Sequence, residues 1–358
     1  MVANHYPVKI RSIEVIVIYR VKITPQIALD NRPLRQQLLN SILPQLKQWI
    51  GDPVLSGMTI YSTRHNSNKE QTFSSENYQL NIRQVKTFDI KGNPNMLLLF
   101  LNNALRNVMS RLNYVEIGRT SKFFDTKNRT EFDGLFMYPG FQASFNRLEG
   151  GVYLKVDSAN KIVNNKNVLQ VIDGIYKKYQ NEDKERKRDL IKEELVNKII
   201  MTNYGKPRYY RIEDIDFRQA AEVMLDNTSM SIVAYYKDKY GYEVKNVKQP
   251  LLKVEDKKRK PEQGPVLLIP EMCLMTGIPD DFDEMRRKKV SERTIKNPQD
   301  KLRDIESLMK GKLSKESDMK ELAELGLDVS RNLMSFKAKV APMPKLQLGK
   351  DKSVQQGK

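Results

Sequence analysis

Apolar residues recur in this chain at two different spacings, and the spacing changes repeatedly along its length. Within Lys9–Ile23 they fall at every second position, which predicts a β-strand. Over Asn31–Ile50 they recur at helical spacing, and Pro33 suits the first turn of a helix. The same patterns predict three further elements, which are short strands at Thr59–Tyr61 and Tyr78–Val85 and a buried helix over Met96–Leu112. This succession predicts an α+β unit that ends near Gly118.

Beyond Gly118 the patterns become shorter, and turn residues punctuate them. The pairs Asp133-Gly134 and Pro139-Gly140 predict turns within an aromatic-rich stretch. The apolar stripe of Val168–Tyr179 predicts a helix, and the densely charged Gln180–Lys192 predicts a second, solvated one. Strands are predicted at Val152–Val156, in several places within Leu195–Val254, and at Leu333–Val340. The whole chain is predicted to be multidomain, since 358 residues suffice for about two or three domains.

Few side chains in the sequence suit metal or nucleophilic chemistry. The chain has two histidines, His5 and His65, and one cysteine, Cys273. These are too few for a histidine-based triad, a zinc finger or a disulfide framework. Cys273 lies among apolar residues and is predicted to be buried. The sequence therefore predicts no catalytic residue, no metal site and no cofactor.

Carboxylates are the remaining candidates for catalysis. Glu213, Asp214 and Asp216 lie close together in the sequence, and two-metal nucleases use such clusters. These residues accompany a predicted strand, however, where carboxylates commonly supply hydrogen bonds to turns. We interpret them as structural.

A formal net charge of +18 favours a polyanionic partner. Basic side chains gain affinity for nucleic acid because neutralised phosphates release counterions. A solvated lysine-rich surface would give the same composition. The longest apolar run, Met96–Leu101, is too short to span a bilayer, and no membrane partner is predicted. The basic run Lys257–Lys260, followed by Pro261, predicts an exposed linker.

Tyrosines interleave with basic residues between positions 204 and 242. Single-stranded RNA offers splayed bases that stack on aromatic rings and phosphates that accept hydrogen bonds, so this composition suits such a ligand. Packing in a core is the alternative, and about half of these tyrosines are expected to be buried. The seven are Tyr204, Tyr209, Tyr210, Tyr235, Tyr236, Tyr240 and Tyr242.

Four stretches resemble the Piwi branch of the Argonaute family. Their order and spacing match, and the resemblance covers nearly the whole chain. They are Asn4–Tyr6; Ile117–Arg119 followed by Pro139–Phe141; Tyr209–Asp216 followed by Tyr235–Tyr240 and Lys248–Leu252; and Leu268–Gly277, which is similar to the family's "LIPELCxxTG" signature. The resemblance implies an N domain (1–118), linker 1 (119–164), a PAZ domain (165–262) and linker 2 (263–358). It also implies that the MID and PIWI domains, which follow in the family, are missing here.

A PAZ domain in this family is an OB-like β-barrel with an inserted hairpin and helix, and it anchors the 3′ end of a guide RNA. Carried over by position, the resemblance assigns the 3′-end contacts to seven residues. These are Arg208, Tyr210, Tyr235, Lys239 and Tyr240, with Leu251 or Leu252 as an apolar floor. Asn203 stands near the place of a usual histidine, and Met224 near that of a usual phenylalanine. A methionine there would suit a 2′-O-methylated 3′ end.

The resemblance therefore implies binding of a single-stranded small guide RNA, with target RNA as a partner of the full-length protein. Residence in the cytoplasm or the nucleus would be compatible with such a role. Two other functions stay open. The chain could belong to a Dicer-like ribonuclease, which also carries PAZ, although the "LIPELCxxTG" stretch argues against this. It could also be a basic scaffold for protein interactions.

Overall fold

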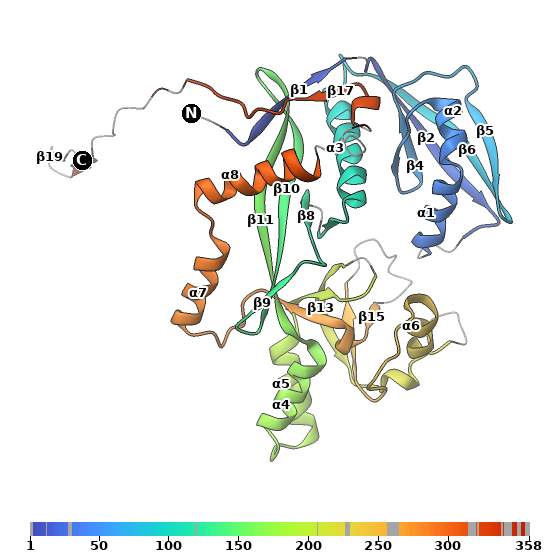
Figure 1. The fold of residues 1–358 in the computed structure, drawn as a ribbon. Coiled ribbons are helices and arrows are strands. Elements are labelled where there is room, and N and C mark those ends of the chain that lie inside the picture. The colour runs from blue at the N-terminus through green and yellow to red at the C-terminus, as the bar shows by residue number, and fades with distance from the viewer. Residues whose placement is uncertain are drawn as a thin grey trace.

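The computed structural model describes residues 3–11, 13–27, 31–118, 120–205, 207–225, 230–255, 265–313, 320, 322–337, 339, 346–348 and 352–354. Within these residues the chain is a mixed α+β structure, as expected, with a twelve-stranded and a five-stranded antiparallel sheet (Figure 1). A separate two-stranded pairing joins β18 (Leu346–Leu348) to β19 (Lys352–Val354). The predicted linker at Lys257–Lys260 lies outside the described residues.

The smaller sheet forms the core of the N-terminal unit. In spatial order its strands are β3 (Val54–Ser56), β4 (Thr59–Ser62), β2 (Val15–Thr24), β6 (Tyr78–Asp89) and β5 (Glu70–Ser75). Helices α1 (Arg32–Ser41) and α2 (Leu43–Ile50) pack against it. Trp49 lies between two rings of the sheet, with centroids 5.2 Å from Tyr19 and 5.8 Å from Phe73. The strands predicted at residues 59–61 and 78–85 are confirmed.

Two elements predicted as continuous are broken in the structure. β2 confirms the strand predicted over Lys9–Ile23 from Val15 onward, but the prediction of one continuous strand is wrong, because β1 (His5–Ile10) ends before β2 begins and the two strands join different sheets. The helix predicted over Asn31–Ile50 divides at Ile42, and Pro44 occupies the first turn of α2. A proline is favourable there because its missing N–H has no partner in a first turn.

Helix α3 (Pro94–Arg111) confirms the helix predicted over Met96–Leu112. One side of it is fully buried, including Phe100 and Leu101. These side chains pack with Tyr6 of β1 and Phe145 of β10 (Leu135–Leu148) in the largest hydrophobic cluster of the described residues. Helix α3 therefore joins the N-terminal unit to the twelve-stranded sheet.

A long hairpin of β10 and β11 (Gly151–Asn167) is the axis of the larger sheet. The turn predicted at Pro139-Gly140 is wrong, because both residues lie inside β10 and pair with Asn160 and Ala159. Gly140 is needed for close packing and not for a turn: a Cβ there would lie 2.2 Å from the Phe123 carbonyl oxygen. The turn predicted at Asp133-Gly134 is confirmed, and both residues have positive φ.

The remaining strands extend this hairpin on both sides. The main path of the sheet runs β15 (Val266–Leu268), β14 (Leu251–Val254), β13 (Tyr209–Asp216), β12 (Ile199–Thr202), β16 (Cys273–Thr276), β11, β10, β8 (Lys122–Phe124) and β7 (Val115–Glu116). Off this path, β1 pairs with β11 and with β17 (Leu327–Val329), and β9 (Thr130–Phe132) pairs with β10. Strand β11 therefore holds β10 along one edge, and β1 and β16 along the other.

Helices α4 (Val168–Lys178) and α5 (Lys184–Leu195) confirm the two helices predicted after the hairpin. They pack on β12, β13 and β14 through a cluster that includes Ile172, Ile191 and Ile212. Cys273 is fully buried there, as predicted. Between β13 and β14 the chain leaves the sheet and forms a short 3₁₀ turn (Ala220–Glu222) and helix α6 (Ile232–Tyr240).

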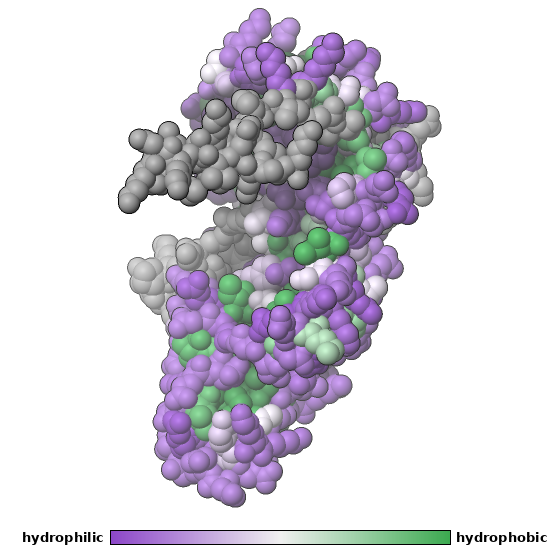
Figure 2. All heavy atoms as spheres, turned by 90° about the vertical axis from the view of Figure 1, so that its left-hand side faces the viewer, coloured by the Kyte–Doolittle hydropathy of each residue, from purple (hydrophilic) through white to green (hydrophobic). Residues whose placement is uncertain are grey.

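The C-terminal part carries α7 (Glu284–Thr294), α8 (Pro298–Glu306) and a π-helical turn (Ser307–Lys312). The side of the molecule shown in Figure 2 is mainly hydrophilic, with separate hydrophobic patches. The strand predicted at Leu333–Val340 is wrong, because in the described part of that range only Ser335 has a β-type bridge. The late strand is instead β17, which pairs with β1.

Candidate functional site

Helix α6 begins and ends at strong local signals. The Ser231 side chain accepts a hydrogen bond from the Ala234 N–H at 3.2 Å, which caps the N-terminus. Gly241 closes the C-terminus in the left-handed conformation, which glycine adopts at little cost. The helix is fixed against the sheet by Ile232 and Tyr236, both buried.

Four aromatic rings meet on and beside α6. We call Tyr204, Tyr235, Tyr236 and Tyr240 the tyrosine cluster. Ring centroids are 4.7 Å apart for Tyr204 and Tyr240, 5.1 Å for Tyr204 and Tyr236, 5.6 Å for Tyr236 and Tyr240, and 5.8 Å for Tyr235 and Tyr236. Most of these pairs have the edge-to-face geometry that aromatic quadrupoles favour.

The tyrosine cluster has a buried side and an open side. Tyr236 is only 3% exposed, and its hydroxyl lies 2.9 Å from that of Tyr204, so that each satisfies the other. Burial raises the pKa of both phenols. Tyr240 is 38% exposed and offers a ring face to a ligand. Partial burial, with a smaller effect of Tyr235, raises the pKa of Tyr240 to about 12, so its hydroxyl is a donor at neutral pH.

Positive charge accompanies the rings. The Lys239 Nζ donates to the Tyr235 hydroxyl at 2.5 Å and lies 4.7 Å from the centroid of that ring. It is also 5.9 Å from the Tyr240 centroid. Arg208 is close enough that its charge opposes the rise in the Tyr240 pKa. Aromatic faces, phenolic donors and two cations are therefore together on one surface, which suits an anionic, base-bearing ligand.

Strand β14 supplies the floor beneath the tyrosine cluster. Leu251 is fully buried in the same hydrophobic cluster as Tyr236. Leu252 is equally buried, but it packs with Tyr210 in the cluster under α4 and α5. Neighbouring residues of a strand point to opposite faces, which separates these two leucines. Of the two leucines predicted as a floor, Leu251 therefore packs with the tyrosine cluster.

A groove of about 890 Å³ leads away from the tyrosine cluster, between the N-terminal unit and the large sheet. Gly205 lines one end of it, and a side chain at this position would meet the Tyr240 ring at 3.4 Å. The other walls come from α1, α2, β3, the C-terminal half of α3 with the residues that follow it, the segment around Lys127, and Glu324 with Leu325. The groove therefore comes close to the Tyr240 ring at Gly205.

Comparison with known proteins bears on this geometry. The model of the PAZ domain family matches residues 172–297, a range that contains the tyrosine cluster. Piwi-like protein 1 of Gallus gallus is 30% identical over 260 residues, which is 70% of this chain and 29% of that protein. Protein aubergine of Drosophila melanogaster is 23% identical over 371 residues, which is 98% of this chain and 41% of that protein.

This chain is a homologue of the Piwi-clade Argonaute proteins. Its fold agrees: a crystal structure of Drosophila Piwi superposes with a TM-score of 0.59 at 21% identity, covering 93% of this chain and 42% of that one. A crystal structure of Aa-Ago with externally bound siRNA gives a TM-score of 0.51 at 13% identity, over 99% of this chain and 46% of that one. The Piwi homologue thus spans less than half the length of each of these proteins, in a part that contains PAZ.

The residues assigned from the Argonaute resemblance divide into two groups. Tyr235, Lys239 and Tyr240 lie together on α6, with Arg208 nearby. Leu251 packs beneath them, whereas the other assigned residues are not among the contacting side chains. Tyr210 is half-buried on the other face of β13, and Asn203 is exposed with its N–H bonded to the Met272 carbonyl at 2.9 Å.

Met224 is the remaining assigned residue of the second group. It is 53% exposed and forms a β-bridge with Ser231, the residue that caps α6. It therefore lies at the N-terminal end of the helix, whereas Tyr240 lies at the C-terminal end.

Two members of the tyrosine cluster, Tyr204 and Tyr236, were not assigned from the sequence. For Tyr236 the signal was available, because it lies four positions before Tyr240 and shares its helix face. For Tyr204, on the segment after β12, no local pattern predicts the approach to α6. The expectation that half of the seven tyrosines are buried is wrong, because only Tyr236 is fully buried.

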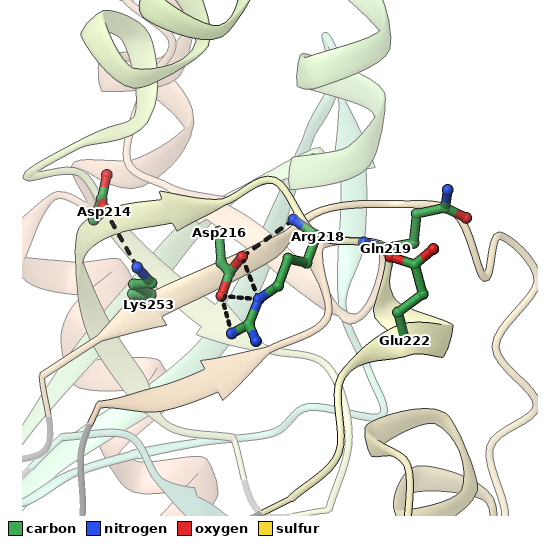
Figure 3. Close-up of polar contacts among 6 residues, drawn as sticks. All are labelled: Asp214, Asp216, Arg218, Gln219, Glu222 and Lys253. Carbon is green, nitrogen blue, oxygen red and sulfur yellow. Dashed lines mark hydrogen bonds and ion pairs between the residues drawn. The ribbon is translucent and has the colours of Figure 1, made fainter.

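Of the three carboxylates of β13, Glu213 is exposed, and the other two are paired with cations, as Figure 3 shows for Asp214 with Lys253 and Asp216 with Arg218. Asp216 lies 2.6 Å from the Arg218 Nη2, and this hydrogen bond lowers its pKa. Asp214 lies 2.8 Å from the Lys192 Nζ, which lowers its pKa as well. Both carboxylates thus stabilise the strand.

Among the residues that the structure describes, no group of three or more histidine, cysteine, aspartate or glutamate side chains could hold a metal ion. Within the same residues, no helix is both long and apolar enough to cross a bilayer.

Proposed function

We propose that this chain binds a single-stranded guide RNA and that the tyrosine cluster anchors the RNA 3′ end. The observation that carries the proposal is the open face of Tyr240 beside Lys239 and Arg208, within a PAZ region of a Piwi homologue. Target RNA would be a partner of the longer protein.

The chemistry of the cluster supports this role. The terminal base stacks on the Tyr240 ring, and every base has a π-face that such stacking can use. Lys239 and the phenolic hydroxyls donate to the last phosphates, while Arg208 adds charge from the segment before β13. Leu251 keeps the floor apolar and holds the rings in place. Because Tyr236 is buried, its role is to position the other rings.

We also propose that the site accepts a 2′-O-methylated ribose. The exposed thioether of Met224 is a flexible apolar surface that tolerates an added methyl group, and because it lies at the opposite end of α6 from Tyr240, this contact requires the RNA 3′ end to run along the helix. Comparing RNAs that differ only in a terminal 2′-hydroxyl or 2′-O-methyl group tests this. Met224→Gln should remove any preference for the methylated RNA, and a preference that survives this change would assign it elsewhere.

The 3′-end assignment is tested with RNAs that differ only at their 3′ ends. Tyr240→Ala should weaken binding of RNA with an open 3′ end by about 1–3 kcal/mol, the usual value of one stacked base, and barely change binding of RNA whose end carries a bulky block. Val247→Ala, at an exposed apolar position of the same region, is the control. Equal losses for open and blocked RNAs would mean that Tyr240 is a general contact.

We propose further that the chain binds RNA without cutting it, since two of the three carboxylates of β13, Asp214 and Asp216, are paired with basic side chains. Incubation of labelled RNA with the protein and Mg²⁺ tests this. Cutting that persists through repurification and is lost in Asp214→Asn or Asp216→Asn would overturn it. A basic protein-interaction scaffold would instead show no dependence on the RNA 3′ end.

A further inference from the structure

Lys161 projects from β11 into an apolar surface. The residues two positions before and after it, Ala159 and Val163, pack in one hydrophobic cluster with Tyr138 and Tyr209. Tyr138 lies directly opposite Lys161 in the β10–β11 ladder. Side chains at every second position of a strand share a face, so the half-buried Lys161 extends along this cluster.

Among the described residues, the Lys161 amine has an aromatic neighbour but no acidic one. Its Nζ lies 4.7 Å from the centroid of the Tyr209 ring. Within the described part of the chain, no carboxylate forms an ion pair with it, and burial together with the charge of Lys122 lowers its pKa. A ring face attracts an ammonium group but does not satisfy three N–H donors. A partly buried cation in this position therefore lacks a counter-ion.

Two further groups nearby suit the same missing ligand. Lys122, exposed on β8, is close enough to affect the Lys161 pKa. The Tyr209 hydroxyl is buried and has no hydrogen-bond partner among the described residues. Two cations and an unused hydroxyl donor are the groups that proteins use for an oxyanion.

We propose that Lys161 and Lys122 bind one backbone phosphate of the RNA, at the junction of β8, β11 and β13. This inference rests on the proposed binding of single-stranded RNA. The Tyr209 ring holds the Lys161 amine in position, and the unused Tyr209 hydroxyl is a third donor to the phosphate. Tyr209 directly follows Arg208, whose charge reaches Tyr240, so the start of β13 links the phosphate site to the tyrosine cluster. An extended polyanion can occupy both sites, whereas a free phosphate ion would occupy one.

The salt dependence of RNA binding tests the inference. Each phosphate contact with a single strand contributes about 0.7 to the slope of log affinity against log salt concentration. Lys161→Met should lower that slope by about 0.7 and the affinity by about fivefold at roughly 0.1 M salt, for open and blocked RNAs alike. Lys161→Arg should restore both values. Lys166→Met, an exposed lysine of the same strand, is the matched control and should change neither.

Stability and free phosphate complete the experiment. Replacing a partly buried cation by methionine should leave the melting temperature unchanged or raise it, so weaker binding will not reflect unfolding. If Lys161→Met and Lys122→Met leave the salt slope unchanged while Tyr240→Ala keeps its 3′-end effect, the inference is overturned and the proposed function stands. A second result would also overturn it. In that case inorganic phosphate raises the melting temperature of the wild type but not of Lys161→Met, while the salt slopes of RNA binding are the same for the two proteins. A slope change without any 3′-end effect would support the phosphate site and contradict the 3′-end anchor.

Discussion

Strand β13 and helix α6 each carry two adjacent tyrosines, but they use them in opposite ways. Tyr209 and Tyr210 point to opposite faces of β13 and enter different hydrophobic clusters. Tyr235 and Tyr236 of α6 have ring centroids 5.8 Å apart, and the helix brings Tyr240 back to both. A strand therefore distributes neighbouring aromatics between cores, whereas a helix gathers residues four positions apart on one surface.

The largest effect on the difference between β13 and α6 is expected from Tyr236, the buried ring of α6. Tyr236→Ala should lower the free energy of local opening of α6 by about 3–5 kcal/mol, because a large side chain leaves a cavity. Hydrogen exchange of the α6 amides measures this quantity. Tyr236→Phe, which removes only the hydroxyl contact with Tyr204, should cost about 1 kcal/mol. Equal losses for both changes would mean that the ring itself contributes little.

The next largest difference between α6 and β13 is expected in RNA affinity. Tyr240→Ala should reduce affinity for RNA with an open 3′ end by about 1–3 kcal/mol. Tyr210→Ala should reduce it less, since Tyr210 packs against the core under α4 and α5. Titration of labelled RNA under one salt condition measures both. Matching losses would show that β13 and α6 contribute equally to the 3′-end site, and the contrast between them would then fail for function.

Alkaline titration tests the partial burial of Tyr240, the residue of α6 that distinguishes it from β13. Its folded pKa is about 12, above the ordinary value of 10.0, so the folded state holds the proton more tightly than the unfolded state. The stabilisation is therefore complete below about pH 10 and is lost as the pH rises toward about 12. The tyrosinate absorbance of the wild type minus that of Tyr240→Phe should titrate near pH 12. A difference spectrum that titrates near pH 10 would contradict the partial burial of this ring.

The smallest effect is expected at the ion pairs of β13. Lys192 and Asp214 are both substantially exposed, so Asp214→Asn should cost only about 0.2–1 kcal/mol in urea unfolding. The folded pKa of Asp214 lies below the ordinary 3.8, so this contribution is present above pH 3.8 and is lost as the pH falls through the folded pKa. RNA affinity should not change. A large loss of affinity in Asp214→Asn would give β13 a role in the site that its ion pairing argues against.

Local patterns in the sequence were sufficient for three helices, although they missed the break between α1 and α2. The apolar periods of α3 and α4 and the charged α5 are properties of short segments, and all three helices occur where they were predicted. The strand and turn predictions failed where pairing between strands distant in sequence determines the structure. Pro139-Gly140 resembles a turn locally, but β8 and β11 pair with β10 on either side and keep it extended. The break between β1 and β2 likewise depends on two sheets whose other strands are distant in sequence.

The same distinction applies to the site. Tyr235, Lys239 and Tyr240 are brought together by a helix of nine residues, so their proximity follows from spacing alone. Leu251 and Leu252 could be told apart only by knowing which face of β14 lies under α6. Tyr204 and the pairing of Lys161 with Tyr209 depend on contacts across the fold, which no segment of sequence encodes by itself.

The pairing of β1 with β17 has a consequence for synthesis. Val8 lies opposite Val329, so β1 completes its ladder only after the long stretch of chain between these two residues has been made. At a translation rate of about 5–20 residues per second, β17 is made roughly 15–60 s after β1. The sheet of β2 to β6 can form before that. During that interval β1 has an open edge of the kind that invites pairing with other chains. Newly made protein should therefore depend on chaperones through β1 until β17 has been made.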